Sequence, residues 1–207
     1  HKRQRSVHLS TRRDKMSSKS DRRSIRTKKE LKDNLIALLS TGRIIESISV
    51  KELADLADIS RSTFYLHYSD IYDLLDDIEN DFFDEFRSVF DGFHPEELTE
   101  SPLPRIDGML AFAAKNSRLV LSLADNQIDM SFSRKIKNIA HGICFDSWSQ
   151  LYPVSDRTKY EYFFPFIFSG CIDLILTWLR GGIKESRQYM SDLLETFIMD
   201  GASVLRS

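Results

Sequence analysis

The sequence has few of the residues that form disulfide and metal sites. It holds 2 cysteines in 207 residues, Cys144 and Cys171, and they form no CxxC pair. Neither a disulfide framework nor a cysteine zinc site is therefore expected. The 5 histidines show no metal-ligand spacing. Both thiols lie in apolar stretches typical of buried free cysteines in a reducing cytosol, so we predict a cytoplasmic protein without metal or cofactor.

Features of membrane proteins and enzymes are also missing. No apolar run approaches the roughly 18–20 residues that cross a bilayer, so no membrane partner is expected. The basic N-terminus lacks the apolar stretch of a secretion signal. The common phosphate-binding, hydrolase and metalloprotease motifs do not occur. His141 and Asp146 share one helical stretch, but no nucleophile accompanies them. We therefore expect no enzymatic activity.

Charge is unevenly distributed along the chain. The formal net charge of −2 would by itself argue against a nucleic-acid partner. Residues 1–30, however, hold twelve Lys or Arg and three acidic residues, so the remainder is strongly acidic. Residues 31–68 hold four bases against five acids, which is a low charge for a DNA surface.

Met16 divides the basic N-terminal region into two parts. Residues 1–15 show no apolar periodicity, and we expect them to be vector-derived, with Met16 as the natural start. The alternative is that they form a genuine DNA-binding arm. Residues 1–23 are expected to be a disordered basic tail, while the segment Arg22–Lys29 remains basic whichever alternative holds.

Short helices with polar caps follow a first helix that is expected to begin near Ser24. Ser49, with Glu52 three residues later, is a capping box for the second helix. Ser60 precedes a third helix and Asp70 precedes a fourth. Three helices and a longer one, with a tight turn between the second and third, indicate a helix-turn-helix.

The third helix carries side chains suited to DNA. Phe64 is expected to point into the core of the domain. The side chains then turned outward are those of Arg61, Ser62, Thr63 and Tyr65. Their polar groups can bond bases and phosphates, and Thr and Tyr add apolar contact.

Helical periodicity also dominates the rest of the chain. Residues 95–104 hold three prolines and predict a loop. Helices are expected near residues 106–114, 119–123, 132–151, 158–179 and 187–204. No strand alternation persists, so the pattern predicts an all-α protein of about nine helices.

The run VKELADLADISRSTFYLHY, from Val50 to Tyr68, closely resembles the DNA-binding domain of TetR-family transcriptional regulators. The family pattern is roughly V-x-x-[LI]-A-x-x-A-G-V-S-x-x-[TS]-[FL]-Y-x-[HY]-F, and the likeness covers residues 24–70. Asp58 stands where glycine is usual, and Asp tolerates the left-handed conformation better than most residues. Ile71 stands where many members have a phosphate-binding lysine.

This resemblance implies a helix-turn-helix domain over residues 24–70 and a helical bundle for regulation and dimerisation over residues 71–207. It implies a homodimeric regulator of the repressor type that binds a pseudo-palindromic DNA operator and is released or modulated by a small hydrophobic effector. The DNA-binding residues suggested by the resemblance and by the helix N-termini are Arg26, Thr27, Lys28, Ser49, Lys51, Ser60, Arg61, Ser62, Thr63, Tyr65 and His67.

Residues 112–124 and 178–186 also look like this family, which suggests that the last two helices form a four-helix dimer interface. A helix that is apolar on nearly all faces must be buried on all sides. The expected interface residues are Phe168, Ile172, Ile175, Trp178, Leu193, Leu194 and Phe197. Candidate effector-binding residues, on aromatic stripes that are more often core than pocket, are Phe82, Phe86, Phe112, Trp148, Tyr162 and Phe166.

A second hypothesis stays open. The chain could be a TetR-fold protein-interaction module, or a co-activator that acts through a partner protein. The low charge of residues 31–68 favours this alternative, whereas the outward residues of the third helix favour DNA.

Overall fold

The computed structural model describes residues 3–89, 103–125, 132, 134–142 and 157–202. Every regular element in these residues is a helix, as predicted. The chain divides into two compact units, residues 1–78 and 79–207. The division falls inside helix α4 (Ile71–Ser88), and not at residue 70 as the sequence pattern suggested.

Helix α1 (Arg3–Leu39) opens the first unit. It begins at Arg3, and not near Ser24, so residues 3–23, expected as a disordered tail, are its N-terminal part. The chain has no glycine or proline before Gly42, and nothing in the local sequence therefore interrupts a helix upstream of Ser24. The buried stripe of α1 consists of Thr27, Leu31, Leu35 and Leu39.

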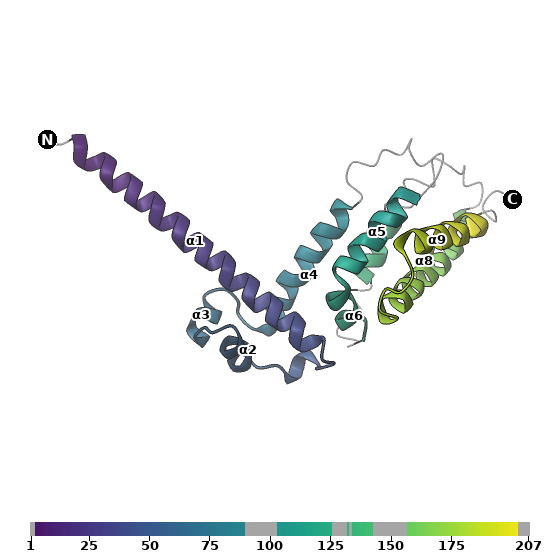
Figure 1. Ribbon diagram of the computed structural model, residues 1–207, viewed down its shortest axis with the longest axis horizontal. Helices are drawn as coiled ribbons and strands as arrows, with labels where there is room; N and C mark the ends of the chain where they lie inside the picture. The colour runs from purple at the N-terminus through teal and green to yellow at the C-terminus, as the bar shows by residue number, and fades with distance from the viewer. Residues whose placement is uncertain (1–2, 90–102, 126–131, 133, 143–156, 203–207) are drawn as a thin grey trace. The chain divides into compact units, whose positions relative to one another are not determined.

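Two short helices complete the core of this unit. After a turn at Gly42 and a 3-10 turn (Ile45–Ser47), the chain forms α2 (Val50–Leu56) and α3 (Arg61–Tyr65). Helix α2 packs against α1 and α3 packs against α2, beside the C-terminal half of α1 (Figure 1). Leu53 of α2 and Phe64 of α3 are both fully buried.

The first two turns of α4 close the same core. Ile71, Leu74, Leu75 and Ile78 are all buried there. The Asp73 N–H donates to Oδ1 of the expected cap, Asp70, at 2.9 Å. These turns are covered by the first unit, which is why the division falls after Ile78.

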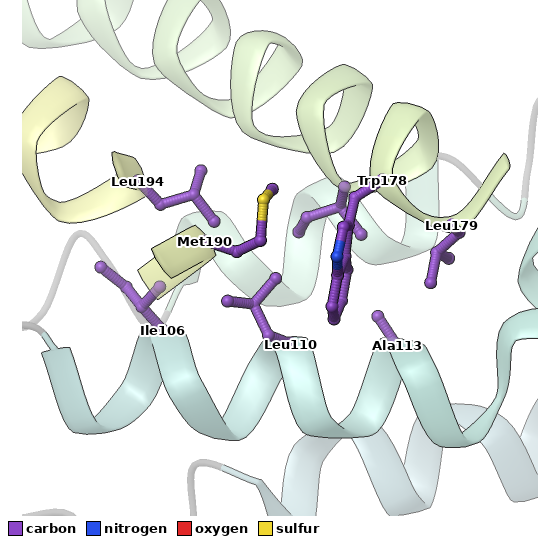
Figure 2. Close-up of a cluster of buried hydrophobic side chains, with 8 residues drawn as sticks. Ile106, Leu110, Ala113, Trp178, Leu179, Met190 and Leu194 are labelled. Carbon is purple, nitrogen blue, oxygen red and sulfur yellow. The ribbon is translucent and has the colours of Figure 1, made fainter. Parts of the chain in front are cut away.

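The second unit contains α5 (Leu103–Lys115), α6 (Ser117–Asp125), a helical stretch over residues 134–142, α8 (Arg157–Arg180) and α9 (Arg187–Ala202). Helix α5 packs against α6, α8 and α9. The three helices α5, α8 and α9 enclose an apolar cluster (Figure 2). Its buried members are Ile106, Leu110, Ala113, Ile175, Trp178, Leu179, Met190 and Leu194.

A tight loop joins α8 to α9. The Ile183 N–H donates to the Trp178 carbonyl at 3.0 Å, and the Trp178 indole N–H donates to the Glu185 carbonyl at 3.0 Å. Gly182 has φ 83° and Ile183 has φ 57°. The left-handed region suits glycine but strains a β-branched residue.

The predicted dimer residues fall into two groups. Ile175, Trp178 and Leu194 lie in the apolar cluster of their own chain, so the prediction that they face a partner is wrong. The prediction overlooked α5, which covers this side of α8 and α9. The remaining candidates are half-buried or exposed, and they are Phe168, Ile172, Leu193 and Phe197.

The segment Glu161–Arg180 of α8 is long and apolar enough to cross a membrane by length and composition alone, with a mean hydropathy of 1.6. The sequence pattern predicted no such segment, because only uninterrupted runs of apolar residues were considered. Charged residues such as Asp173 interrupt the apolar run in this segment. Only 28% of the segment is buried inside the chain. Length and composition do not distinguish a membrane span from a helix that packs on another protein surface.

Candidate nucleic-acid interface

Serine side chains start both short helices. The Ser49 hydroxyl accepts a hydrogen bond from the Glu52 N–H at 3.1 Å, which caps α2. The Ser60 hydroxyl accepts from the Thr63 N–H at 3.1 Å, which caps α3. Ser60 Oγ also lies 2.7 Å from Ser62 Oγ and 2.9 Å from Thr63 Oγ1. Three hydroxyl groups are therefore held together at the N-terminus of α3.

The turn between α2 and α3 follows the prediction made from its residues. Asp58 has φ 52°, so it occupies the left-handed region where the family pattern has glycine. The Ile59 N–H donates to the Ala54 carbonyl at 3.0 Å and closes the end of α2. Ala54 and Ala57 are buried, as close crossing of two helices requires.

Helix α3 is anchored by one aromatic ring and exposes the others. Phe64 is fully buried. The Tyr65 and Phe64 rings pack edge-to-face, with their centroids 5.6 Å apart. Tyr65 is nevertheless 58% exposed. Arg61 and Ser62 are exposed as expected, whereas Thr63 and His67 are half-buried.

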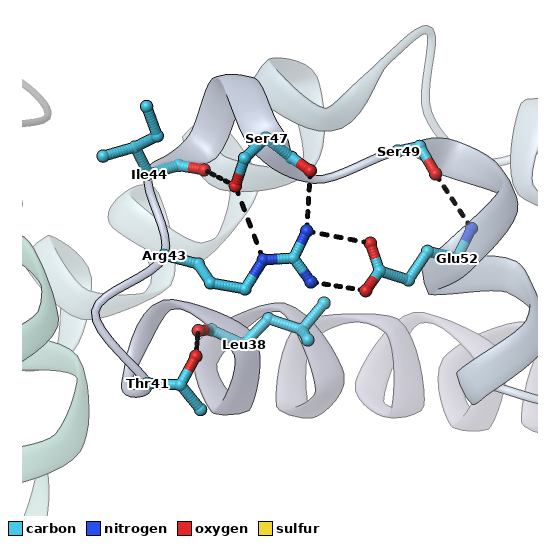
Figure 3. Close-up of polar contacts among 7 residues, drawn as sticks. All are labelled: Leu38, Thr41, Arg43, Ile44, Ser47, Ser49 and Glu52. Carbon is cyan, nitrogen blue, oxygen red and sulfur yellow. Dashed lines mark hydrogen bonds and ion pairs between the residues drawn. The ribbon is translucent and has the colours of Figure 1, made fainter.

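Arg43 links the turn before α2 to Glu52 in α2 (Figure 3). The Arg43 guanidinium binds both carboxylate oxygens of Glu52, with Nη2 to Oε2 at 3.1 Å, and donates to the Ser47 carbonyl at 2.6 Å. The Arg43 hydrogen bonds lower the pKa of Glu52, opposed by burial and assisted by the arginine charge and the Ser49 N–H. The sequence did not predict this pair, because Arg43 and Glu52 are nine positions apart and do not lie on the same helix.

A second carboxylate joins α1 to α4. The Tyr68 hydroxyl donates to Asp77 Oδ2 at 2.7 Å, and Lys32 Nζ lies 3.0 Å from the same oxygen. Burial raises the pKa of Asp77, but the hydrogen bonds from Tyr68 and Lys32 and the charges of Lys32 and Lys28 outweigh it, so the pKa is lowered.

Two of the predicted DNA contacts on α1 point toward the protein. Thr27 is only 8% exposed because it lies one helical turn before Leu31 on the buried stripe, so its assignment to the DNA surface is wrong. Lys28 Nζ lies 3.5 Å from Asp77 Oδ2 and 5.0 Å from the Tyr68 ring centroid. Lys28 is thus engaged by its own chain.

The other predicted cations differ in whether a carboxylate neutralises them. The Arg26 side chain is 79% exposed but pairs with Glu30 at 2.9 Å. Lys51 and Arg61 are exposed and form no ion pair within the described residues 21–89. These two cations stand at the N-terminal ends of α2 and α3, beside the exposed caps Ser49 and Ser60.

The candidate effector residues do not form one site. Phe82, Phe86 and Phe112 are buried together, with ring centroids 4.9 Å apart for Phe82–Phe112 and 5.6 Å for Phe86–Phe112. Tyr162 and Phe166 are 77% and 75% exposed, so the prediction that they share a site with these buried rings is wrong. They lie on a face of α8 that the described residues leave exposed. Trp148 lies outside the described residues.

Metal binding has no support in the part of the chain that the structure describes. No group of three His, Cys, Asp or Glu side chains there is placed to hold a metal ion. Cys171 is half-buried in α8.

Comparison with known proteins relates the chain to transcriptional regulators. Residues 100–200 match the model of a TetR-type transcriptional regulator C-terminal region. A 65-residue stretch is 35% identical to the uncharacterized HTH-type transcriptional regulator YxbF of Bacillus subtilis (strain 168). That stretch is 31% of this chain and spans 17% of the relative's length.

Solved structures share the fold over most of the chain. A TetR transcriptional regulator from Streptococcus agalactiae 2603V superposes with a TM-score of 0.64 at 21% identity, covering 88% of this chain and 98% of the other. The chain belongs to the TetR family of transcriptional regulators.

Two further solved structures have this fold, and both are regulators. The dihydroxyacetone kinase operon activator DhaS has a TM-score of 0.59 at 15% identity, covering 87% of this chain and 98% of its own. The fatty acid degradation regulator FadR from Bacillus halodurans has a TM-score of 0.59 at 14% identity, covering 83% and 94%. At these identities the likeness supports the TetR fold alone.

Proposed function

We propose that this TetR-family regulator is a homodimeric repressor that binds a pseudo-palindromic DNA operator through the outward face of α3. The observation that carries the proposal is the exposure of Arg61, Ser62 and Tyr65 on a helix anchored by the fully buried Phe64. These side chains are free to contact DNA without any rearrangement of the core. Arg61 and Ser62 supply hydrogen bonds to base edges, and Tyr65 and His67 supply bonds to phosphates.

The N-terminus of α2 provides the second part of this surface. Lys51 carries an uncompensated charge there, and Ser49 holds the helix start in place. Both the helix N-terminus and a lysine attract phosphate. Because Lys28 binds Asp77 and Thr27 is buried, we assign the electrostatic part of binding to Lys51 and Arg61, with Arg26 contributing if it releases Glu30.

The dimer is proposed to form through the uncovered faces of α8 and α9. Large aromatic side chains are exposed on these faces, and half-buried apolar residues lie on the same helices. The residues are Tyr162, Phe166, Phe168 and Ile172 on α8, with Leu193 and Phe197 on α9. An exposed apolar surface of this kind marks a protein interface. A two-fold axis through it would repeat the DNA-binding surface, as a pseudo-palindromic site requires.

A small hydrophobic effector is proposed to bind at the aromatic cluster of the second unit. This cluster brings together the rings of Phe82, Phe83, Phe86, Phe112 and Phe132. Such rings give a ligand apolar contact but no charged anchor. An effector would have to displace packed rings, and its binding would show as a raised unfolding temperature.

Selection from a randomised duplex pool tests the DNA-binding proposal. The full chain should enrich one palindromic site, and its affinity should fall steeply with salt because bound phosphates release counterions. Tyr65→Ala should weaken binding to that site about tenfold, the loss expected for one phosphate hydrogen bond. Tyr72→Ala removes another exposed tyrosine, at 51% exposure in α4, and should bind like wild type.

A protein-interaction module or co-activator is the second candidate. It is favoured by the ion pairs of five of the seven Lys and Arg residues between positions 21 and 43, namely Arg26, Lys28, Lys29, Lys32 and Arg43. If the full chain enriches no sequence even at low salt, this candidate replaces the repressor proposal.

A further inference from the structure

Leu66 is the most exposed of the large apolar residues that the structure describes, at 81%. It directly follows α3, and its dihedrals of φ −74° and ψ −18° are helical. Its side chain therefore continues the helical spacing, one turn after Ser62 and beside Tyr65. Both of those residues are exposed, so Leu66 extends the outward face of α3.

The backbone presents this leucine in a fixed position. The Leu66 N–H is shared between the Ser62 carbonyl at 3.2 Å and the Thr63 carbonyl at 3.3 Å. Phe64 on one side and Tyr68 on the other are anchored in the core, at 0% and 3% exposure. Covering an apolar side chain that a rigid support holds out into water is favourable, because it removes apolar surface from water.

The surroundings of Leu66 indicate which kind of surface would complement it. Its exposed neighbours are a cation and hydroxyl groups, namely those of Arg61, Ser62 and Tyr65. The core of a protein interface is instead a contiguous patch of apolar and aromatic residues with few charges. One apolar group among hydrogen-bonding groups matches the major groove of DNA, where the thymine C5-methyl lies among base donors and acceptors.

We propose that Leu66 is a specificity-determining residue that reads a thymine methyl group in each half of the operator. The proposal rests on the proposed function, because it requires α3 to enter the major groove. It adds a preference for thymine at one position that the polar residues of α3 do not determine. The family pattern leaves the corresponding position unspecified, so a leucine here would distinguish this regulator's operator from others.

Replacement of thymine by deoxyuridine tests the contact directly, because uracil pairs identically and lacks only the methyl group. The site enriched by the wild-type chain is resynthesised with each thymine replaced in turn, and dissociation constants are measured at one salt concentration. Replacing the contacted thymine in one half-site should weaken wild-type binding about fourfold. Replacing it in both half-sites should weaken binding about fifteenfold, because one buried methyl group is lost from each half-site. Leu66→Ala should bind the thymine site more weakly and no longer distinguish it from the deoxyuridine site.

Leu56→Ala is the matched control. Leu56 is also an exposed leucine of the helix-turn-helix, at 52%, but it ends α2 instead of extending α3. This variant should keep the wild-type response to deoxyuridine. Circular dichroism of both variants should show wild-type helicity and unfolding temperature, since neither side chain is buried.

The outcomes separate this inference from the proposed function. If the wild-type chain enriches no site, the proposed function fails and the inference fails with it. If it enriches a site but no deoxyuridine replacement weakens binding, or if Leu66→Ala keeps the wild-type response, the inference alone is overturned. Leu66 would then be left for a protein partner.

Discussion

The helices of residues 1–78 and those of residues 79–207 differ in what fixes their ends and faces. Helices α2 and α3 have 7 and 5 residues, too short to be stable by their own propensity. Each is started by a serine cap, and ion pairs join the elements around them. Helices α8 and α9 have 24 and 16 residues and are held by an apolar cluster.

This difference shows where each unit is sensitive to substitution. In the first unit, polar contacts fix the starts of the short helices around an apolar core, and few large apolar residues besides Leu66 are exposed on the outward face. Burial shapes the second unit, and it leaves excess apolar surface on α8 and α9. Removing buried apolar volume should therefore have the largest effect in either unit, whereas removing single polar groups should have smaller effects, concentrated in the first unit.

The largest effect is expected from Trp178→Ala. The indole is 3% exposed at the centre of the apolar cluster and also bonds the Glu185 carbonyl. Its removal should cost about 3–5 kcal/mol of unfolding free energy, measured by urea denaturation. Tyr189→Ala, which truncates a 57% exposed ring on α9, should cost far less. Equal losses in the two variants would contradict the apolar-cluster account.

The excess apolar surface predicts the next effect. Phe197→Asp places a charge on the proposed dimer face at a residue that is 51% exposed in its own chain. The dimer dissociation constant should rise about 30-fold or more, as for the loss of an interface hot spot. Sedimentation velocity measures it. Tyr72→Asp introduces the same charge at equal exposure outside that face, and it should sediment like wild type.

In the first unit, Asp77→Asn should cost about 1 kcal/mol at neutral pH, because it removes the charge that Lys32 and Lys28 contact. The folded pKa of Asp77 is lowered below its ordinary value of 3.8. Its contribution is therefore fully present above that value and is lost as pH falls through the lowered pKa. Urea denaturation of both proteins from pH 7 to pH 2 should show the difference vanish at the acid end. A constant difference would exclude an ionic origin.

A slightly smaller loss, about 1 kcal/mol or less, is expected for Ser60→Ala, which removes the cap of α3. Ser40→Ala removes another exposed hydroxyl, which donates to the Ile36 carbonyl at the end of α1, and should change stability by less than about 0.5 kcal/mol. Thermal unfolding monitored by circular dichroism compares the two. If both serines behave alike, capping is not what holds the short helices.

The smallest effect has the opposite sign. Ile183→Asn should stabilise the chain by a few tenths of a kcal/mol, about 0.5 at most, because asparagine tolerates the left-handed φ of 57°. Gly182→Ala should destabilise it by about 1 kcal/mol, since it places a side chain at φ 83°. Differential scanning calorimetry resolves both shifts. A loss of stability in Ile183→Asn would mean that the packing of the isoleucine outweighs its backbone strain.

Local signals in the sequence predicted the first unit well. Ser49, Ser60 and Asp70 act as caps, and Asp58 adopts the left-handed turn. Thr27 was assigned to the surface although its position one turn before Leu31 already placed it on the buried stripe. The Arg43–Glu52 pair could not be predicted, because its members share no helix and meet only after the chain has turned.

The second unit was predicted less well because its contacts are distant in sequence. The apolar pattern of α8 predicted a helix with more than one buried face. It could not predict that Trp178 packs against α5 or that Phe166 lies on the exposed face. That choice depends on which helix packs where, and a periodic pattern does not contain this information.

The division of the chain inside α4 has a practical consequence for isolating the DNA-binding part. A fragment cut at residue 70, where the loop before α4 ends, would lose Leu74, Ile78 and Asp77 together. Lys32, whose side chain is 16% exposed, would lose the Asp77 carboxylate that it contacts. The shortest autonomous fragment should therefore end after Ile78, within a helix. Chimeras that exchange the regulatory half should likewise be joined in register along α4, and not at a loop.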